Sequence, residues 1–415
     1  MNEWSRPFGR IESLDGPCIV ASYEARMPER ASAMRKAGNF AVGQTVGTWV
    51  KIPGISERMI QQYQGVVVGL DETGQAPDGQ ILYRLRIAFP SVNFGGSLTQ
   101  MMTALVGNDV STSIRTRLLD LEFRNGAESA FSAPKQGIRE LRALTGVYDR
   151  PLVLNMIKPC LGYTSEEGLA LFRQVAAGGM DLVKDDELLG SPAYNDVAER
   201  TALYVKASEE LYAETGKRTL YLPNISGRPS QMRDNARRVL DAGGRACLVN
   251  YVFGGLDALL ELNEEFGSKL FILAHYAGLS VMEGGIENGV YLGLLARLAG
   301  AHAVMTMCPD PNRDAAMQDF RKTVQMQRLP LASLPPIVTV VGGGITPVNQ
   351  QWIQAALGND VIIGIGGAVQ GHPMGPTVGA QTAIYAVDAV AKGISVRDAA
   401  EEHEGLRAAL SLWPE

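Results

Sequence analysis

The sequence predicts an α/β protein in which a small N-terminal α+β domain of the ferredoxin-like type precedes a (β/α)8 barrel, the TIM-barrel architecture. From about residue 150, short apolar runs alternate with longer amphipathic runs, and eight such pairs can be counted. Before about residue 145 strand-like and helix-like stretches follow no regular order, which is typical of a mixed domain. We therefore expect an N-terminal domain at 1–145 and a barrel with a C-terminal helical tail at 146–415.

Several elements can be placed in the N-terminal region. Apolar runs predict strands at residues 65–69, 81–88 and 116–123. Helical spacing of apolar residues predicts helices at residues 56–64 and 98–105.

The barrel region has a more regular pattern. Strands are expected at 152–157, 180–183, 219–223, 246–250, 270–274, 303–307, 337–341 and 361–365. Helices are expected near 165–177, 195–215, 229–242, 256–266, 287–299, 313–327, 347–357 and 377–391. Alternating strands and helices require parallel strand pairing. Eight units fit a closed barrel better than a doubly wound open sheet, which would leave the last pair unexplained.

Composition excludes several classes of protein. The 415 residues are 46% hydrophobic, and 38 Lys+Arg against 44 Asp+Glu give a net charge of −6, which excludes a disordered chain. Without a basic block, neither a nucleic acid nor an anionic membrane is expected as the main partner. No secretory signal and no uncharged run of the roughly 18–20 residues of a membrane span is found, so a cytoplasmic location is expected. Four scattered cysteines indicate neither a disulfide framework nor a zinc site.

Candidate site residues follow from the barrel itself, because barrel chemistry takes place at the carboxyl ends of the strands. The polar residues and glycines directly after the predicted strands are Lys158, Lys184, Asp185, Asp186, Glu187, Asn224, Ser226, Asn250, His275, Gly342, Gly343, Gly344, Gly366 and Gly367.

The stretch GMDLVKDDE at 179–187 predicts a metal site. Strand alternation puts Lys184 and Asp186 on one side and Asp185 on the other, while Glu187 can turn back at the strand end. Two carboxylates in this arrangement suit Mg²⁺, which prefers oxygen ligands. Lys184 would repel the ion unless it carries CO₂ as a carbamate. The alternative is a solvated charged loop.

Two further residues are candidates for proton transfer. Lys158, in NMIKPCLG, is expected to be partly desolvated near other cations, which would lower its pKa and allow acid or base chemistry near neutral pH. The alternative is an ion pair with the acidic cluster. His275, in LAHYAG, could move a proton, or it could be a hydrogen-bonded core residue.

Two glycine-rich loops end the last two strands. In VVGGGITP (340–347) and IGIGGAVQGHPMG (363–375), glycines would let backbone N–H groups approach a phosphate. The alternative is tight turns, which also favour glycine.

These motifs, in this order, resemble the ribulose bisphosphate carboxylase (RuBisCO) superfamily, and more closely its non-carboxylating RuBisCO-like branch. The resemblance implies that Lys184 is carbamylated and binds Mg²⁺ with Asp186 and Glu187. It implies catalytic roles for Lys158 and His275. It places Gly343, Gly344, Gly366 and Gly367 near one substrate phosphate.

The resemblance also implies an obligate homodimer, either alone or as the unit of a higher oligomer. VGTW (46–49) and LVGN (105–108) are similar to segments that reach the barrel mouth of the other subunit. Thr48, Trp49 and Asn108 would therefore bind the small phosphorylated substrate from across the dimer.

Departures from the carboxylases exclude CO₂ fixation as the expected reaction. No lysine lies between Thr306 and Arg321, where carboxylases hold the incoming CO₂, and 43–46 lacks their glutamate. Cys160 replaces a second lysine. Tyr276 and Val304 replace an arginine and a histidine, which suggests a substrate with one phosphate.

The resemblance implies that the enolisation apparatus is intact. We expect Mg²⁺-dependent enolisation or isomerisation of a phosphorylated keto sugar or diketone through an enediolate, with the carbamate or neutral Lys158 as the base. Alternatives are a decarboxylase or transcarboxylase of a phosphorylated 3-keto sugar acid, or a non-catalytic scaffold. The sequence resembles the methionine-salvage enolase branch, but Asn108 stands where that branch has a catalytic lysine.

Overall fold

A computed structural model describes residues 6–48, 50–331 and 334–413 of the chain. The chain divides into two compact units. The first comprises Met1–Ala133, Leu279–Ala299 and Pro330–Leu334, and the second Pro134–Gly278, Gly300–Leu329 and Pro335–Glu415. A domain boundary at residue 145 stays a prediction.

The first unit contains an antiparallel four-stranded sheet with the order β2-β3-β1-β4, as expected for a ferredoxin-like domain. Its strands are β1 (Cys18–Met27), β2 (Val66–Gln75), β3 (Ile81–Pro90) and β4 (Thr116–Arg124). Its first helices are α1 (Arg30–Gly43), α2 (Glu57–Tyr63), α3 (Leu98–Val106) and α4 (Asn108–Thr112). The predicted strands and helices are confirmed, and β1, α1 and α4 are additional.

Aromatic packing joins α1 to the sheet. Phe40 of α1 contacts Tyr23 of β1 and Phe89 of β3 edge to face, with centroid separations of 5.2 and 6.4 Å. All three rings are buried, so the helix covers one face of the sheet.

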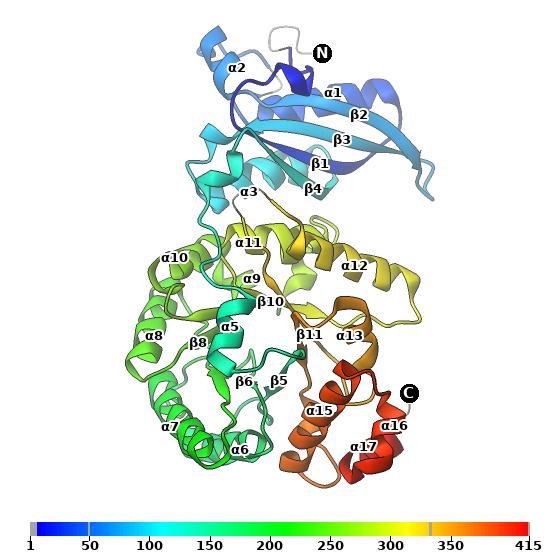
Figure 1. Cartoon of the computed structure of the whole chain (residues 1–415). Coiled ribbons are helices and arrows are strands. Elements are labelled where there is room, and N and C mark those ends of the chain that lie inside the picture. Colours follow the sequence, from blue (N-terminus) through cyan, green and yellow to red (C-terminus); the bar gives the residue numbers. More distant parts are fainter. Residues whose placement is uncertain (1–5, 49, 332–333, 414–415) are drawn as a thin grey trace. The chain divides into compact units, whose positions relative to one another are not determined.

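The second unit contains eight parallel strands, which confirms the predicted barrel (Figure 1). They are β5 (Leu152–Met156), β6 (Leu182–Lys184), β7 (Leu220–Leu222), β8 (Ala246–Asn250), β9 (Phe271–His275), β10 (Ala303–Met307), β11 (Val338–Gly342) and β12 (Val361–Gly364). Their order is β7-β6-β5-β12-β11-β10-β9-β8. A parallel bridge from Asn224 to Leu248 joins the chain after β7 to β8, so the barrel is nearly closed.

Helices surround these strands (Figure 1). They are α5 (Ile138–Thr145), α6 (Ser165–Ala177), α7 (Val197–Thr215), α8 (Pro229–Asp241), α9 (Tyr251–Gly254), α10 (Leu256–Phe266), α12 (Asp314–Arg328), α13 (Gln351–Leu357), α14 (Gly367–Gln370) and α15 (Pro376–Ala391). The predicted tail forms α16 (Val396–Glu402) and α17 (Glu404–Leu412). The predicted helix near 287–299 is a π-helix at Val290–Leu295 continued by α11 (Ala296–Leu298), and both belong to the first unit.

Side chains alternate between two cores. Leu152, Leu154 and Leu182 belong to the cluster inside the barrel, whereas Val153 and Val183 belong to the cluster between the strands and the helices. Continuing this alternation places the even-numbered residues after β5 and β6 on the inner face.

Within the described part of the chain, every helix is too short or too polar to cross a membrane. The cytoplasmic location stays a prediction.

Candidate active site

The candidate residues of the barrel lie at the carboxyl ends of its strands. Lys184 and His275 are the last residues of β6 and β9, and Lys158 comes two residues after β5. Met156 pairs with Lys184 in the parallel register, so Lys158 lies level with Asp186. Neighbouring strands therefore bring together residues that are 28 positions apart.

Lys184 is buried, with 1% of its side chain exposed. Its Nζ donates to the carbonyl oxygen of Asp185 at 3.1 Å and to Oε2 of Glu187 at 3.4 Å. Burial lowers the pKa of Lys184, and the nearby charges of Glu187 and Asp186 only partly reverse this effect. The neutral amine is therefore easier to reach than in a solvated lysine.

Asp186 is also buried and accepts two hydrogen bonds. Lys158 Nζ lies 2.5 Å from Oδ2, and the Leu188 N–H donates to Oδ1 at 3.1 Å. Burial is the largest single effect and raises the pKa of Asp186, but the hydrogen bonds from Lys158 and Leu188, together with the charge of Lys158, outweigh it, so the net shift is downward. With Lys184, Asp185 and Asp186 all buried, this segment is not a solvated charged loop.

The expected lowering of the Lys158 pKa is wrong. Burial is the largest single effect and lowers the pKa of Lys158, but the hydrogen bonds to Asp186 and Cys160, together with the charge of Asp186, outweigh it and the net shift is upward. Its Nζ also lies 3.1 Å from Cys160 Sγ. The alternative from the sequence, an ion pair with the acidic cluster, is what the structure contains.

His275 contacts the same cluster. Its Nε2 lies 3.4 Å from Oε2 of Glu187, and its Nδ1 accepts the N–H of Ala277 at 3.1 Å. Burial and then the charge of Lys184 lower the pKa of His275 to about 4, so the ring is neutral at pH 7. With Nδ1 acting as an acceptor, the proton resides on Nε2 and points to Glu187.

Glu187 therefore has two donors. Burial raises the pKa of Glu187, whereas the positive charge of Lys184 is the largest of the effects that lower it, and the net shift is downward. Both Asp186 and Glu187 are carboxylates at neutral pH.

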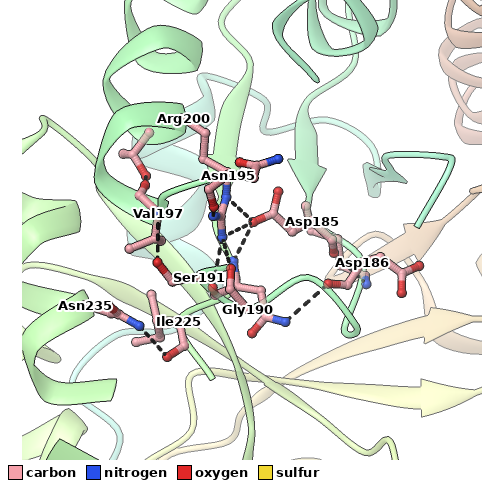
Figure 2. A network of polar contacts seen from close by, with 12 residues as sticks. Asp185, Asp186, Gly190, Ser191, Asn195, Val197, Arg200, Ile225 and Asn235 are labelled. Carbon is pink, nitrogen blue, oxygen red and sulfur yellow. Dashed lines mark hydrogen bonds and ion pairs between the residues drawn. The ribbon is translucent and has the colours of Figure 1, made fainter. Parts of the chain in front are cut away.

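Asp185 points to the outer side of β6, as strand alternation predicts. Its carboxylate accepts from Arg200 Nε at 2.9 Å, the Tyr221 hydroxyl at 2.6 Å and the Asn224 N–H at 2.8 Å. Figure 2 shows the Arg200 guanidinium beside Asp185 while Asp186 is turned away from it. The sequence did not suggest Arg200. The feature of the sequence that could have indicated its role is the position of this arginine on the same, buried face of α7 as Val197, Thr201 and Tyr204.

The two glycine loops begin side by side, since Gly342 pairs with Gly364. Gly343 and Gly344 have φ angles of +99° and +70°. A Cβ at Gly343, Gly344 or Gly367 would meet no atom within 4 Å. Among the described residues, the N–H groups of Gly343, Gly344, Gly366 and Gly367 have no hydrogen-bond acceptor. Gly343, Gly344 and Gly367 therefore have open space beside their Cα atoms, whereas a Cβ at Gly366 would meet Met156 at 3.3 Å.

Asn155 supports the second loop and was not a candidate from the sequence. It is fully buried on β5, donates to the carbonyl oxygen of Ile365 at 2.8 Å, and accepts from Gln370 at 2.8 Å. It thereby links the strand of Lys158 to the loop of Gly366 and Gly367.

Three candidates come from the N-terminal region. Thr48 and Asn108 belong to the first unit, and Trp49 lies outside the described residues. Gln44 donates to the carbonyl oxygens of Thr103 and Ala104 and accepts the Asp109 N–H at 3.2 Å, so it ties the end of α1 to the start of α4. The substrate contacts of Thr48, Trp49 and Asn108 stay predictions.

The residues present fit Mg²⁺ only with the modified lysine. No group of three His, Cys, Asp and Glu side chains that could hold a metal occurs within the described residues. Asp186 and Glu187 supply two anionic oxygen ligands, and the buried amine of Lys184 is beside them. A carbamate on Lys184 would complete an oxygen-rich set of the kind that Mg²⁺ prefers.

Two family descriptions match the chain. Residues 15–125 match the N-terminal domain of the ribulose bisphosphate carboxylase large chain, and residues 137–413 match its catalytic domain. Among curated proteins, a ribulose bisphosphate carboxylase-like protein of Archaeoglobus fulgidus is 32% identical over 399 residues, covering 93% of this chain and 90% of that protein. A 2,3-diketo-5-methylthiopentyl-1-phosphate enolase of Geobacillus kaustophilus is 32% identical over 411 residues, covering 95% and 98%.

Solved structures show the same fold. The rubisco-like protein MtnW of Alicyclobacillus acidocaldarius has a TM-score of 0.85 at 31% identity, covering 95% of this chain and 100% of that one. A dimeric archaeal Rubisco of Hyperthermus butylicus has a TM-score of 0.88 at 27% identity, covering 99% of each chain. An octameric Rubisco of Pyrococcus horikoshii has a TM-score of 0.90 at 27% identity, covering 99% and 97%.

Proposed function

Because the chain belongs to the ribulose bisphosphate carboxylase large-chain family, we propose that it enolises or isomerises a phosphorylated keto sugar or diketone through an enediolate, without fixing CO₂. The observation that carries this proposal is the buried cluster of Lys184, Asp186 and Glu187 at the carboxyl end of β6. Relatives named as enolases support enolase chemistry in general.

The proposed cofactors are Mg²⁺ and CO₂. Neutral Lys184 would add CO₂ through its Nζ lone pair, form a carbamate and release one proton. Asp186, Glu187 and this carbamate would hold Mg²⁺, which supplies a Lewis acid that polarises the substrate carbonyl group. The lowered pKa of Lys184 favours the amine that reacts with CO₂.

Lys158 would act through its charge. Its raised pKa keeps it an ammonium at neutral pH, so it can donate a proton or a hydrogen bond to the oxygen that gains charge. Because an ammonium group cannot accept a proton, Lys158 is not the base, and the carbamate at Lys184 is the remaining candidate. Neutral His275 would keep its Nε2–H directed at Glu187 and hold that carboxylate in place.

The free N–H groups of Gly343, Gly344, Gly366 and Gly367 would bind one phosphate. Backbone donors are well suited to a phosphate because they surround it without bulky side chains. Val304 is buried and Tyr276 stacks on His275, so neither position of a second phosphate site in the carboxylases offers a cation. The substrate would therefore carry a single phosphate.

We further propose a homodimer with an active site shared between subunits, either alone or as the unit of a higher oligomer. Solved relatives include dimeric and octameric assemblies. Gln44 links the two segments that would carry Thr48 and Asn108 to the other subunit's site, so both would be presented together.

Solvent exchange would test the reaction. The protein would be incubated with phosphorylated ketoses and diketones in D₂O with Mg²⁺ and bicarbonate, and deuterium at the α-carbon followed by NMR. Lys184→Ala should abolish exchange, while Lys206→Ala, at an exposed lysine of α7, should leave it unchanged. Absence of exchange with every substrate would overturn the proposal. Release of CO₂ from a 3-keto sugar acid in that case would favour the decarboxylase.

A further inference from the structure

Arg200 lies behind the candidate metal ligands and is fully buried. It comes from the first turn of α7, and all three of its side-chain nitrogen atoms donate hydrogen bonds. Nε donates to Asp185 and to the Tyr221 hydroxyl, at 2.9 and 3.1 Å. Nη1 donates to the Asn195 carbonyl at 2.8 Å, and Nη2 to the carbonyls of Gly190 and Asn224 at 2.7 and 3.1 Å.

These acceptors bracket the loop that carries the candidate ligands. Asp185 is at its start, Gly190 in its middle and Asn195 near its end, so one side chain fixes the loop at three points (Figure 2). Asp186 and Glu187 lie between the first two points. Their backbone therefore has little freedom to move while Arg200 keeps its contacts.

A second connection runs through Asn224, which follows β7. Its backbone N–H donates to Asp185, and its side-chain amide donates to the carbonyl oxygens of Asp186 and Glu187 at 3.2 and 3.0 Å. Arg200 in turn binds the Asn224 carbonyl oxygen. Asp185, Arg200 and Asn224 thus form a closed network that holds the peptide groups of both carboxylate residues.

We infer that the buried Asp185–Arg200 pair is a positioning unit that sets Asp186 and Glu187 in the geometry required for divalent-cation binding. A buried ion pair is weak evidence for stability, because desolvation offsets much of its attraction. Groups that orient metal ligands, by contrast, typically change metal affinity about 10–100-fold when they are altered. The inference rests on the proposed function, since it concerns the same cation site.

The test compares two buried Arg–Asp pairs whose aspartates lie at the two ends of β6. Arg200→Lys keeps the charge beside Asp185 but cannot reach Gly190, Asn195 and Asn224 together. Arg150→Lys is the matched control, because Arg150 is buried and contacts Asp181 at 2.6 and 2.9 Å just before β5 and β6, at the opposite end of the barrel. The probe is Mn²⁺, whose binding is followed by electron paramagnetic resonance in the presence of bicarbonate, with thermal unfolding recorded in parallel.

Arg200→Lys should weaken Mn²⁺ binding about 10–100-fold, while Arg150→Lys should leave Mn²⁺ binding unchanged. These results are expected even if both substitutions lower the unfolding temperature. Equal Mn²⁺ affinities in the two variants would overturn the positioning role while leaving the proposed function intact. Absence of Mn²⁺ binding to the unmodified protein would overturn both. If Arg200→Lys does not fold, Asp185→Asn, which preserves side-chain volume, is expected to show the same loss, and wild-type affinity there would contradict the inference.

Discussion

Lys158 and Asp186 form an ion pair between the ends of β5 and β6, with Nζ 2.5 Å from Oδ2. The contact gives the lysine and the carboxylate opposite pKa shifts that both favour the charged forms. The chain thus places a permanent positive charge next to its candidate metal ligand.

The first prediction concerns Lys158. Lys158→Met should reduce α-proton exchange about 10²–10⁴-fold, because it removes a positioned acid. It should also raise the pKa of Asp186, whose main stabilising hydrogen bond is lost. The exchange rate would be measured by NMR between pH 5 and 8. An unchanged rate would show that Lys158 has only a structural role.

The second prediction concerns Gly367. Gly367→Ala should fold normally, because the added Cβ meets no atom within 4 Å and the φ of Gly367 is not positive. The methyl group would nevertheless occupy the proposed phosphate space and weaken phosphate binding by about tenfold or more, roughly 1.4 kcal/mol. Inhibition by inorganic phosphate would be measured together with thermal unfolding.

Gly16→Ala is the matched control for that variant, since its Cβ also meets nothing within 4 Å but Gly16 precedes β1 in the first unit. It should change neither measurement. Wild-type phosphate affinity in Gly367→Ala would remove this loop from the site.

The third prediction concerns pH and His302. This ring is buried, accepts the Ile272 N–H at Nδ1 and contacts Asn263, and burial lowers its pKa to about 3. Its unfolded pKa is about 6.5. Between pH 6.5 and 3 the unfolded chain therefore binds the additional proton, and stability must fall as pH falls. His302→Gln should flatten this dependence, as measured by urea unfolding at pH 7 and pH 5; an identical slope would contradict the prediction.

The fourth prediction concerns Arg150. Arg150→Met should lower the free energy of unfolding by about 3–5 kcal/mol, because Asp181 would be left as a buried, uncompensated charge. Urea unfolding measures the change. A loss below about 1 kcal/mol would contradict the prediction, since Asp388, the second partner of Arg150, is also an anion and cannot neutralise Asp181.

The fifth prediction tests the shared active site. Lys184→Ala and Asn108→Ala should each be inactive alone, yet a refolded equimolar mixture should recover about a quarter of the wild-type activity, because half of the dimers would contain one intact site. Activity in the Asn108→Ala homodimer, or none in the mixture, would contradict a site built from both subunits.

The barrel was predictable because its strands are buried on both faces. Each strand is a short apolar run between polar loops, so the eight predictions agree with the structure to within a few residues. In the first unit, β1, α1 and the short helix α4 were not predicted. The buried side of α1 consists largely of Ala and Gly, including Ala33, Ala37 and Gly38, and such small residues produce a weak helical pattern.

Most residues of the candidate site could be predicted from the sequence, but the direction of the pKa shift of Lys158 could not. Strand alternation correctly separated Asp185 from Asp186. The pKa of Lys158 depends on the register between β5 and β6, which a single sequence does not specify. Arg200 follows Asp185 by fifteen residues, and its role depends on its side chain being buried against that carboxylate. The charge pattern of α7 does not indicate which charged residue of the helix is buried.

The alternation along β6 separates two kinds of evolutionary constraint. Lys184 and Asp186 belong to the candidate site, whereas Asp185, after β6, and Tyr221, on β7, contact Arg200 of α7. The side chains of Lys184 and Asp186 take no part in the contacts of Asp185 with Arg200 and Tyr221, so they can be exchanged without removing those contacts. A barrel of this kind can acquire a new reaction while the residues that determine its fold stay unchanged.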